Sequence, residues 1–514
     1  MYSSDRNSPP GPIHDMAHAM SDFRFLIQRG VCLAAIAAIL SACAVGPDYV
    51  RPAPPPDTER YSREPLHEAT IAADGQAQHF TPGSMIAADW WRLFKSAQLD
   101  GAVRQAIASN PTLQASEASL RQSQDNLRAG YGVFYPHIGA GMDASRQRSA
   151  ALQQASQKPG TVFTLITLSG TISYALDVFG GERRAVEGLR AQADYQSYAS
   201  TAACLTLTAN VVNTCIARAA YAAQARATGQ LIDLQMQQLH LGEAQVRAGT
   251  APYASLLSLR SLIAANQASL APLKQKISQA EHLLATLEGV MPSGATLPDI
   301  DLAGLTLPLD LPVSLPSDLV RQRPDILSAE AQLHIASANI GVATAALFPS
   351  FSLSGAYGAV GSSLGNLPAA SGRFWSIGPS ATVPVFQGGG LWYGRKAAID
   401  AYEVARANYR QAVLGAFGQV ADSLQALEHD AEGLQAQVEA RTAAGEALDL
   451  LQANYRAGLV AYLDVLAADV QFHQTSIAYV QAVAQRHQDT VALFVSLGGG
   501  WWNAQRPIGE DGAP

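Results

Sequence analysis

The chain has few charged residues and no basic cluster. Asp, Glu, Lys and Arg make up 15% of its 514 residues, against about 25% in an average soluble protein. The net charge is −8, so the sequence lacks the basic surface that nucleic-acid binding requires. Apolar residues make up 48%, which excludes general disorder. Low charge with ample apolar surface instead indicates burial in an oligomer, or a membrane contact made of strands.

Long apolar runs, a cysteine framework and catalytic motifs are also lacking. No apolar run reaches the roughly 18 to 20 residues of a membrane-spanning helix, so we expect no bundle of such helices. Cys204 and Cys215 lie about three turns apart on a helical pattern, too far for a disulfide. The eleven histidines have no metal-ligand spacing, and the glycines at 388–390 lack the Lys of a phosphate loop. We therefore expect no metal, no cofactor and no enzyme. A hydrolase would need a nucleophile and a base that we cannot place.

The N-terminus has the pattern of a secretory signal. Two arginines precede an apolar stretch at 31–40, which is too short to span a membrane. The stretch ends in LSAC, which resembles a bacterial lipobox and predicts a covalent lipid on Cys43. The alternative is an ordinary cleavage site with an incidental cysteine. Residue 44 is Ala rather than the Asp that marks retention in the inner membrane, which favours the outer membrane. A Pro-rich stretch from Gly46 to Tyr61 follows and predicts an extended tether.

The remainder consists of two copies of one unit, roughly 90–290 and 316–500. Asn110-Pro111 recurs as Arg323-Pro324 at an offset of 213 residues, and the RAG that begins at Arg247 recurs at an offset of 209. Such self-similarity indicates an internal repeat. Each copy predicts a helix, two strands, a long helix, a hairpin and a return helix.

The long helices are predicted at about 182–246 and 391–455, where Gly and Pro are nearly absent. At 1.5 Å per residue, each would be close to 100 Å long. The helices at about 111–131 and 253–289 together nearly reach this length, as do those at 325–345 and 460–497. Each long helix can therefore lie against two short helices stacked end to end.

Four strands are predicted, at about 134–147, 163–179, 346–358 and 374–386. In each, apolar residues alternate with Ser, Thr and other polar residues, as in a membrane β-barrel with lipid outside and water inside. A soluble sandwich with one wet face has the same alternation. Pro379 and Pro384 predict a bend or bulge in the last strand. Four strands cannot close a barrel, which needs about eight, so the pattern requires an oligomer. Three chains would give twelve strands.

These features resemble the outer membrane factor family of efflux channels, which have the TolC-type fold, and within it the lipid-anchored NodT-like branch. The resemblance extends from Cys43 to about Trp501. It rests on the order of these segments: LSAC followed by GPDYVRP, DWW at 89–91, RPDILSAEAQL at 323–333, ALFPSFSLSGAYG at 346–358, WSIGPSATVPVFQGGG at 375–390 and YRAGLVAYLDVLAAD at 455–469.

The resemblance implies an α+β, TolC-like homotrimer with two internal repeats per chain. It would form a twelve-stranded transmembrane β-barrel, with four strands from each chain, continued by a long α-helical periplasmic barrel. The chain would divide into a signal peptide with an N-terminal extension (1–42), a lipid-anchored tether and equatorial segment (43–89), the first repeat (90–290), an equatorial connection (291–315), the second repeat (316–500) and a C-terminal tail (501–514).

The implied function is that of the outer membrane channel in a tripartite efflux system. The protein would be a passive export duct for drugs or other small toxic compounds, opened by a periplasmic adaptor (membrane fusion) protein and an inner-membrane pump of the RND type. It would be lipid-anchored in the outer membrane and extend into the periplasm. One alternative is a type I-like duct for protein or peptide secretion. Another is a lipid-anchored periplasmic coiled-coil scaffold, which would have no use for strands of membrane-crossing length.

The hairpin tips, at about 247–252 and 456–461, are the candidate sites. The resemblance assigns adaptor contact to eight residues: Arg247, Ala248, Gly249, Thr250, Arg456, Ala457, Gly458 and Leu459. They are equally explained as helix ends in which Gly stops the helix and Arg favours the C-terminal dipole. Asp464 is a candidate for a gating ring of three carboxylates near the narrow end, or else a helix N-terminal Asp stabilised by the dipole. Asp449 is a weaker gate candidate.

Overall fold

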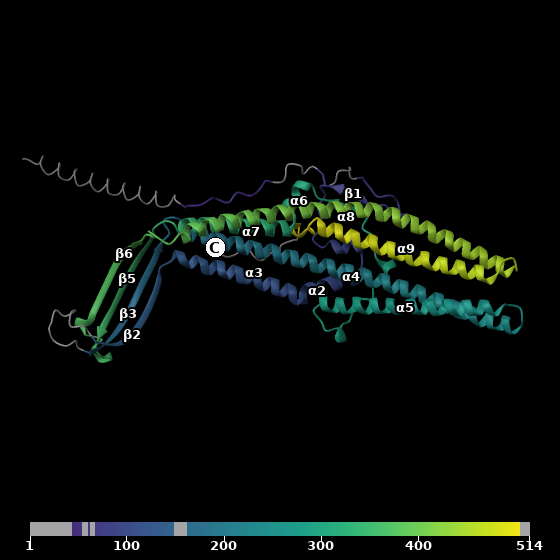
Figure 1. Cartoon of the computed structure of the whole chain (residues 1–514), viewed down its shortest axis with the longest axis horizontal. Coiled ribbons are helices and arrows are strands. Elements are labelled where there is room, and N and C mark those ends of the chain that lie inside the picture. Colours follow the sequence, from purple (N-terminus) through teal and green to yellow (C-terminus); the bar gives the residue numbers. More distant parts are fainter. Residues whose placement is uncertain (1–43, 54–59, 62–66, 149–161, 368, 504–514) are drawn as a thin grey trace, which may run out of the picture. The chain divides into compact units, whose positions relative to one another are not determined.

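The computed structural model describes residues 44–53, 60–61, 67–148, 162–367 and 369–503 (Figure 1). These form two compact units. Among the described residues, one unit comprises 44–50, 125–148, 162–191, 334–367 and 369–404, and the other comprises 51–53, 60–61, 67–124, 192–333 and 405–503. The predicted signal peptide, Cys43 and most of the C-terminal tail lie outside the described residues.

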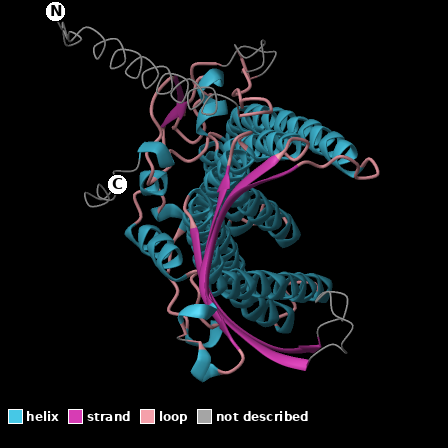
Figure 2. Ribbon diagram, turned by 90° about the vertical axis from the view of Figure 1, so that its left-hand side faces the viewer, coloured by secondary structure: helices cyan, strands magenta, loops and turns pink. Residues whose placement is uncertain are grey.

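The first unit contains a four-stranded antiparallel sheet in the order β2-β3-β5-β6, which Figure 2 shows as a single curved layer. Its strands are β2 (His137–Arg148), β3 (Val162–Leu176), β5 (Ser350–Gly361) and β6 (Arg373–Thr382). Pairing of Met142 with Leu168, and of Leu168 with Ala359, places even positions of β2 and β3 on the same face as odd positions of β5 and β6. This register collects the predicted apolar positions on one face and the Ser and Thr positions on the other.

The last strand differs from its prediction at the two prolines. Pro379 lies within β6 opposite Leu353, and the register runs unbroken from Ser350–Thr382 to Ala359–Arg373, so the expected bulge is absent. Proline is tolerated here because β6 is an edge strand of this sheet. The predicted end at 386 is too late, since β6 ends two residues before Pro384, which has no N–H to donate.

The long helices are α4 (Gly181–Arg247) and α8 (Gly390–Arg456), with 67 residues each. At 1.5 Å per residue each is about 100 Å long, as predicted. Within the described chain, α4 alone has an 18-residue window with a mean hydropathy of 1.2, and 39% of that window is buried. By length and composition α4 could therefore cross a membrane, although it holds no continuous apolar run of that length. One such helix is weak evidence of a span, because core helices have the same composition.

The shorter helices flank the strands and return from the hairpins. They are α2 (Ala97–Ser109), α3 (Pro111–Gly130), α5 (Tyr253–Leu287), α6 (Pro316–Gln322), α7 (Pro324–Ala345) and α9 (Tyr462–Ser496). In the second unit, β1 (His79–Pro82) pairs in parallel with β4 (Asp310–Val313). The main core lies in this unit, where the ring of Trp90 stacks on Phe494 with centroids 5.5 Å apart.

Side chains at equivalent positions of the two repeats join the short helices end to end. Asn110 accepts a hydrogen bond from the Leu113 N–H at the start of α3 (3.0 Å) and donates one to the carbonyl of Leu287, the last residue of α5 (2.9 Å). At an offset of 213, Arg323 precedes α7 and donates to the carbonyl of Ser496, the last residue of α9 (2.7 Å). Both side chains donate to carbonyl groups that have no partner within their own helix because they lie at its C-terminus. These bonds confirm the predicted end-to-end stacking.

Replacing Arg323 by Ala should lower the free energy of unfolding by about 3 kcal/mol, because its buried partners would lose charge-assisted hydrogen bonds. The guanidinium also donates to Gln419 and Asp325, and the side chain is 7% exposed. Thermal or denaturant unfolding of the purified protein would measure the effect. The control is Arg321→Ala, which removes an exposed arginine two residues away. Equal effects of the two substitutions would contradict this account of the junction.

Candidate functional site: the ends of the helical hairpins

Both hairpins reverse direction through the same backbone motif. After α4, the Thr250 N–H donates to the carbonyl of Gln245 (2.9 Å), and Gly249 between them has φ +73°. After α8, the Leu459 N–H donates to Asn454 (2.9 Å), and Gly458 has φ +76°. In each tip, this hydrogen bond closes a turn of six residues around a glycine whose backbone is in the left-handed region. The arrangement is a Schellman motif, which glycine adopts without steric cost. The two tips are therefore structural copies of each other.

All eight tip residues are exposed. Arg247 and Arg456 are the last residues of α4 and α8, where a cation is favoured by the helix dipole. Their role as helix ends is thus visible in the fold. Their contact with an adaptor stays a prediction.

Asp464 has a local partner at the start of α9. Its Oδ2 accepts a hydrogen bond from the N–H of Ala461 (3.0 Å). The equivalent of Ala461 in the first hairpin, at an offset of 209, is Pro252, which has no N–H. There Ser255 replaces Asp464, and its hydroxyl donates to the Pro252 carbonyl (2.7 Å). The second hairpin therefore uses a carboxylate where an amide needs an acceptor, as in half of a capping box.

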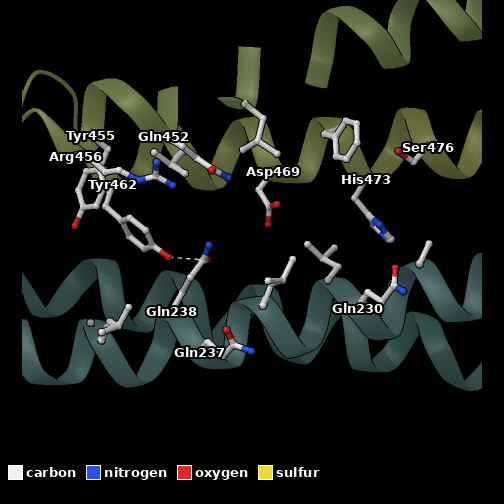
Figure 3. Close-up of a pocket in the computed structure, with 18 of the residues that line it drawn as sticks. Gln230, Gln237, Gln238, Gln452, Tyr455, Arg456, Tyr462, Asp469, His473 and Ser476 are labelled. Carbon is white, nitrogen blue, oxygen red and sulfur yellow. Dashed lines mark hydrogen bonds between the residues drawn. The ribbon is translucent and has the colours of Figure 1, made fainter. Parts of the chain in front are cut away.

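A cavity of about 770 Å³ lies between α4 and the α8–α9 hairpin (Figure 3). Helix α4 contributes mainly glutamine and leucine side chains, and α8 and α9 contribute aromatic, acidic and basic ones. The polar residues around it include Gln230, Gln237, Gln238, Gln245, Arg441, Gln452, Tyr455, Arg456, Tyr462, Asp469, His473 and Ser476.

Three polar contacts between α4 and the second hairpin lie in or beside this cavity. The Tyr462 hydroxyl donates to Gln238 Oε1 (2.7 Å), a bond drawn in Figure 3. Gln235 donates to Asp469 Oδ2 (3.3 Å). Nearer the tips, Gln245 and the Tyr455 hydroxyl lie 3.4 Å apart. These three contacts, here called the rungs, connect the first hairpin to the second.

Burial disfavours the charged forms of the ionisable groups at and near the rungs. It raises the pKa of the Asp469 carboxyl above its ordinary value, which the hydrogen bond from Gln235 only partly opposes. Burial also raises the pKa of the Tyr462 hydroxyl and lowers that of the nearby His473 imidazole, because each loses solvation of its charged form. Two of the three rungs thus join groups that carry no charge, and an apolar cluster that includes Ile232, Leu259 and Leu466 packs between the same hairpins.

The family model for the outer membrane efflux protein matches residues 102–290 and 315–499. Each block contains one long helix and its hairpin. The chain belongs to the outer membrane efflux protein family. Like other members of this family, it is an outer membrane component of an efflux system.

Relatives in the family align over most of their length. The pyoverdine export outer membrane protein OpmQ of Pseudomonas aeruginosa is 30% identical over 450 residues, which is 84% of this chain and 92% of OpmQ. The cation efflux system protein CusC of Escherichia coli is 27% identical over 91% of this chain and 97% of CusC. Among solved structures, the outer-membrane channel OprN has a TM-score of 0.79 at 27% identity and covers 89% of this chain and 100% of OprN. The TolC-type fold is thereby confirmed.

Neither gate candidate takes part in the rungs. Asp464 and Asp449 are both exposed, and neither is among the residues around the 770 Å³ cavity. Asp449 lies beside a smaller hollow with Arg441 and Tyr479. A gating role for either stays a prediction.

The sequence reasoning missed the rungs themselves. Gln238 and Tyr462 are 224 residues apart, and Gln235 and Asp469 are 234 apart. The run of glutamines along α4 was a usable signal, because glutamines spaced by about one or two turns share a helix face.

The hydrogen bond between Asp464 and the Ala461 N–H predicts how substitutions at these two residues combine. Asp464→Ala should destabilise the first turn of α9 by about 1 kcal/mol, since it leaves the Ala461 N–H unpaired. In an Ala461→Pro background the same substitution should have little effect, as at Pro252. The backbone allows this change, because Ala461 has φ −77° and Pro252 has φ −71°. Hydrogen exchange at 462–466 measures both. An equal effect of Asp464→Ala in the two backgrounds would show that the carboxylate acts on something else.

Proposed function

We propose that three copies of this chain form the outer membrane duct of an efflux system. The observation that carries the proposal is a two-faced sheet that continues into two 67-residue helices. Its apolar face is open within one chain: Ile138 is 82% exposed, Trp375 74% and Ile377 69%. β2 and β6 are edge strands of 12 and 10 residues, close to the roughly 9 to 11 that cross a membrane.

Edge strands in lipid need partners, because unpaired backbone groups are costly there. Pairing of β6 in one copy with β2 in the next closes a barrel and satisfies both edges, apart from Pro379, which has no N–H to donate. Three copies supply twelve strands, enough for a water-filled interior lined by the Ser and Thr face. The alternative function, a periplasmic coiled-coil scaffold, does not explain why the apolar face of the sheet is exposed.

The hairpin tips are the proposed contact with a periplasmic adaptor, and an inner-membrane pump of the RND type supplies the energy. The channel is passive, so the pump determines most of the cargo. This view is supported by the relatives' names, since one relative exports pyoverdine and another belongs to a cation efflux system at similar identity to this chain. Drugs and other small toxic compounds are the proposed cargo class.

The rungs are the proposed latch of the closed state. Opening separates the two hairpins, so the rungs must break when the adaptor binds. A hydrogen bond between neutral groups contributes only about 0.5–1.5 kcal/mol. A ladder of this kind holds the hairpins together, yet it can be offset by the binding energy of a partner.

The latch predicts that Tyr462→Phe increases the frequency of channel opening about five-fold, because about 1 kcal/mol of closed-state hydrogen bonding is lost. Single-channel recording in a planar bilayer measures this. Tyr253→Phe is the matched control, since Tyr253 is the equivalent residue of the first hairpin and is exposed. Unchanged gating in Tyr462→Phe would contradict the latch. A trimer that never conducts would contradict the channel itself.

Lipid attachment to Cys43 anchors the mature chain in the membrane. We expect mass spectrometry of protein purified from membranes to find diacylglyceryl and acyl groups on an N-terminal Cys43. Cys43→Ala should carry no lipid. A mature wild-type N-terminus downstream of Cys43, or an unmodified Cys43, would contradict the anchor without contradicting the channel.

A further inference from the structure

Residues 44–49, here called the strap, lie against the start of α4 and the middle of α7 in the first unit. The Val45 N–H donates to the carbonyl of Phe179, just before α4 (3.0 Å). Two close approaches require glycine. A Cβ at residue 180 would lie 2.7 Å from Ala44 Cα, and one at Gly46 would lie 2.5 Å from Gly341 Cα. The sequence predicts an extended tether in the Pro-rich stretch, and its first residues lie against these two helices.

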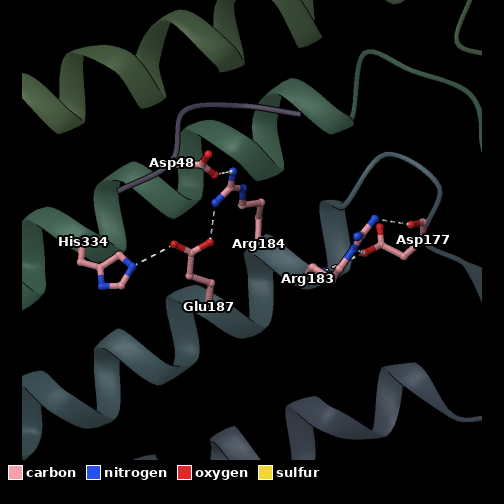
Figure 4. A network of polar contacts seen from close by, with 6 residues as sticks. All are labelled: Asp48, Asp177, Arg183, Arg184, Glu187 and His334. Carbon is pink, nitrogen blue, oxygen red and sulfur yellow. Dashed lines mark hydrogen bonds and ion pairs between the residues drawn. The ribbon is translucent and has the colours of Figure 1, made fainter. Parts of the chain in front are cut away.

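Side chains of the strap, α4 and α7 form a continuous chain of contacts, shown in Figure 4 from Asp48 to His334. Asp48 accepts from Arg184 Nη2 (2.5 Å), and Glu187 accepts from Arg184 Nη1 (2.7 Å). The other oxygen of Glu187 contacts His334 Nε2 (2.8 Å). The His334 ring stacks on Tyr49, with centroids 4.1 Å apart and an angle of 14° between the planes. The contacts thus leave the strap at residue 48 and return to it at residue 49.

The side chain of Arg184 is buried in a site that the neighbouring residues shape to hold it. Its side chain is 7% exposed, and a buried cation is costly unless it is paired. Gly341 makes room for it, because a Cβ there would lie 2.6 Å from Arg184 Cγ. Burial alone would raise the pKa of Glu187, but hydrogen bonds from Arg184 and His334 lower it below its ordinary value. Without the strap, Arg184 would lose one of its two carboxylate partners.

We propose that α4 and α7 form a docking site for the strap, and that Arg184 is the residue that positions it. The site takes a short acidic–aromatic segment of the chain itself, and it joins the first repeat to the second at this end of α4. Given the lipid proposed on Cys43, the docked strap fixes where the anchor leaves the protein, beside the junction of β3 and α4. The anchor is then rigidly attached rather than carried on a flexible tether.

The strap and the rungs differ in strength. Hydrogen bonds between charged partners are roughly twice as strong as those between neutral ones. The strap makes one such bond, between Asp48 and Arg184, whereas two of the three rungs join uncharged groups. One end of α4 is therefore tied firmly to the second repeat, and its other end is held by contacts that a partner can break.

Hydrogen exchange of the purified full-length protein tests the docking. Asp48→Asn should speed exchange at 44–49 about threefold, as expected for the loss of one ion pair whose carboxylate is exposed to solvent, and Asp48→Glu should restore part of the protection. The control is Asp125→Asn, which removes an exposed carboxylate paired with Arg128 at 3.2 Å outside the site. Equal exchange at 44–49 in Asp48→Asn and Asp125→Asn would overturn the proposal, as would wild-type exchange at the rate of an unstructured peptide.

A second pair of variants changes the packing and leaves the charged residues of the site unchanged. Gly→Ala normally stabilises a helix, so a simple helix effect of Gly341→Ala would slow exchange in α7. The docking site predicts the opposite, faster exchange at both 44–49 and 181–190, because the new methyl group displaces Arg184. Gly394→Ala is the control, since a Cβ there meets no atom within 4 Å. Slower or unchanged exchange at 44–49 in Gly341→Ala would overturn the proposal.

The same preparations separate this proposal from the proposed function. A protein that conducts and carries lipid, yet exchanges freely at 44–49, overturns the docking and leaves the channel intact. Protected residues 44–49 in a protein that does not conduct support the docking and overturn the channel. Protection without lipid on Cys43 overturns the strap's role in placing an anchor.

Discussion

A β-strand in lipid cannot leave its backbone groups unpaired, and this constraint determines the rest of the design. The four strands of one chain pair with one another but end in two open edges, β2 and β6. Their register places the apolar positions within these strands on one face, and most of that face is uncovered within the chain. In the proposed trimer, further copies and surrounding lipid satisfy both needs together.

The two repeats meet the same helix-end requirements with different chemistry. The carbonyls that end α5 and α9 are satisfied by an amide at residue 110 and by a guanidinium at residue 323. At the hairpins, Pro252 removes an amide that Ala461 retains, and Asp464 supplies the acceptor which that amide needs. Backbone groups at helix ends must find partners, but any side chain with suitable geometry can serve. Sequence can therefore diverge between repeats while their geometry stays the same.

Helix α4 has different chemistry at its two ends. Near its start, the buried Arg184 lies between two carboxylates. Towards its other end, glutamines meet tyrosine hydroxyls and an aspartate whose pKa is raised by burial. Burying a charge demands permanent pairing, whereas neutral hydrogen bonds exchange with water at little net cost. This difference suits the proposed anchor near one end and the proposed opening at the hairpins.

The sequence by itself determined the local features: the alternation of the strands, the 67-residue helices and the glycine turns at 249 and 458. Each depends on neighbouring residues, so its periodicity or turn chemistry can be read directly. It also located Asp464 at a helix start, though not the amide that this residue pairs with. Only the tertiary structure decided the unbroken register at Pro379, the rungs such as Gln238–Tyr462, and the strap. These depend on residues far apart in the chain, whose side chains meet only after the helices pack, and no local pattern encodes that meeting.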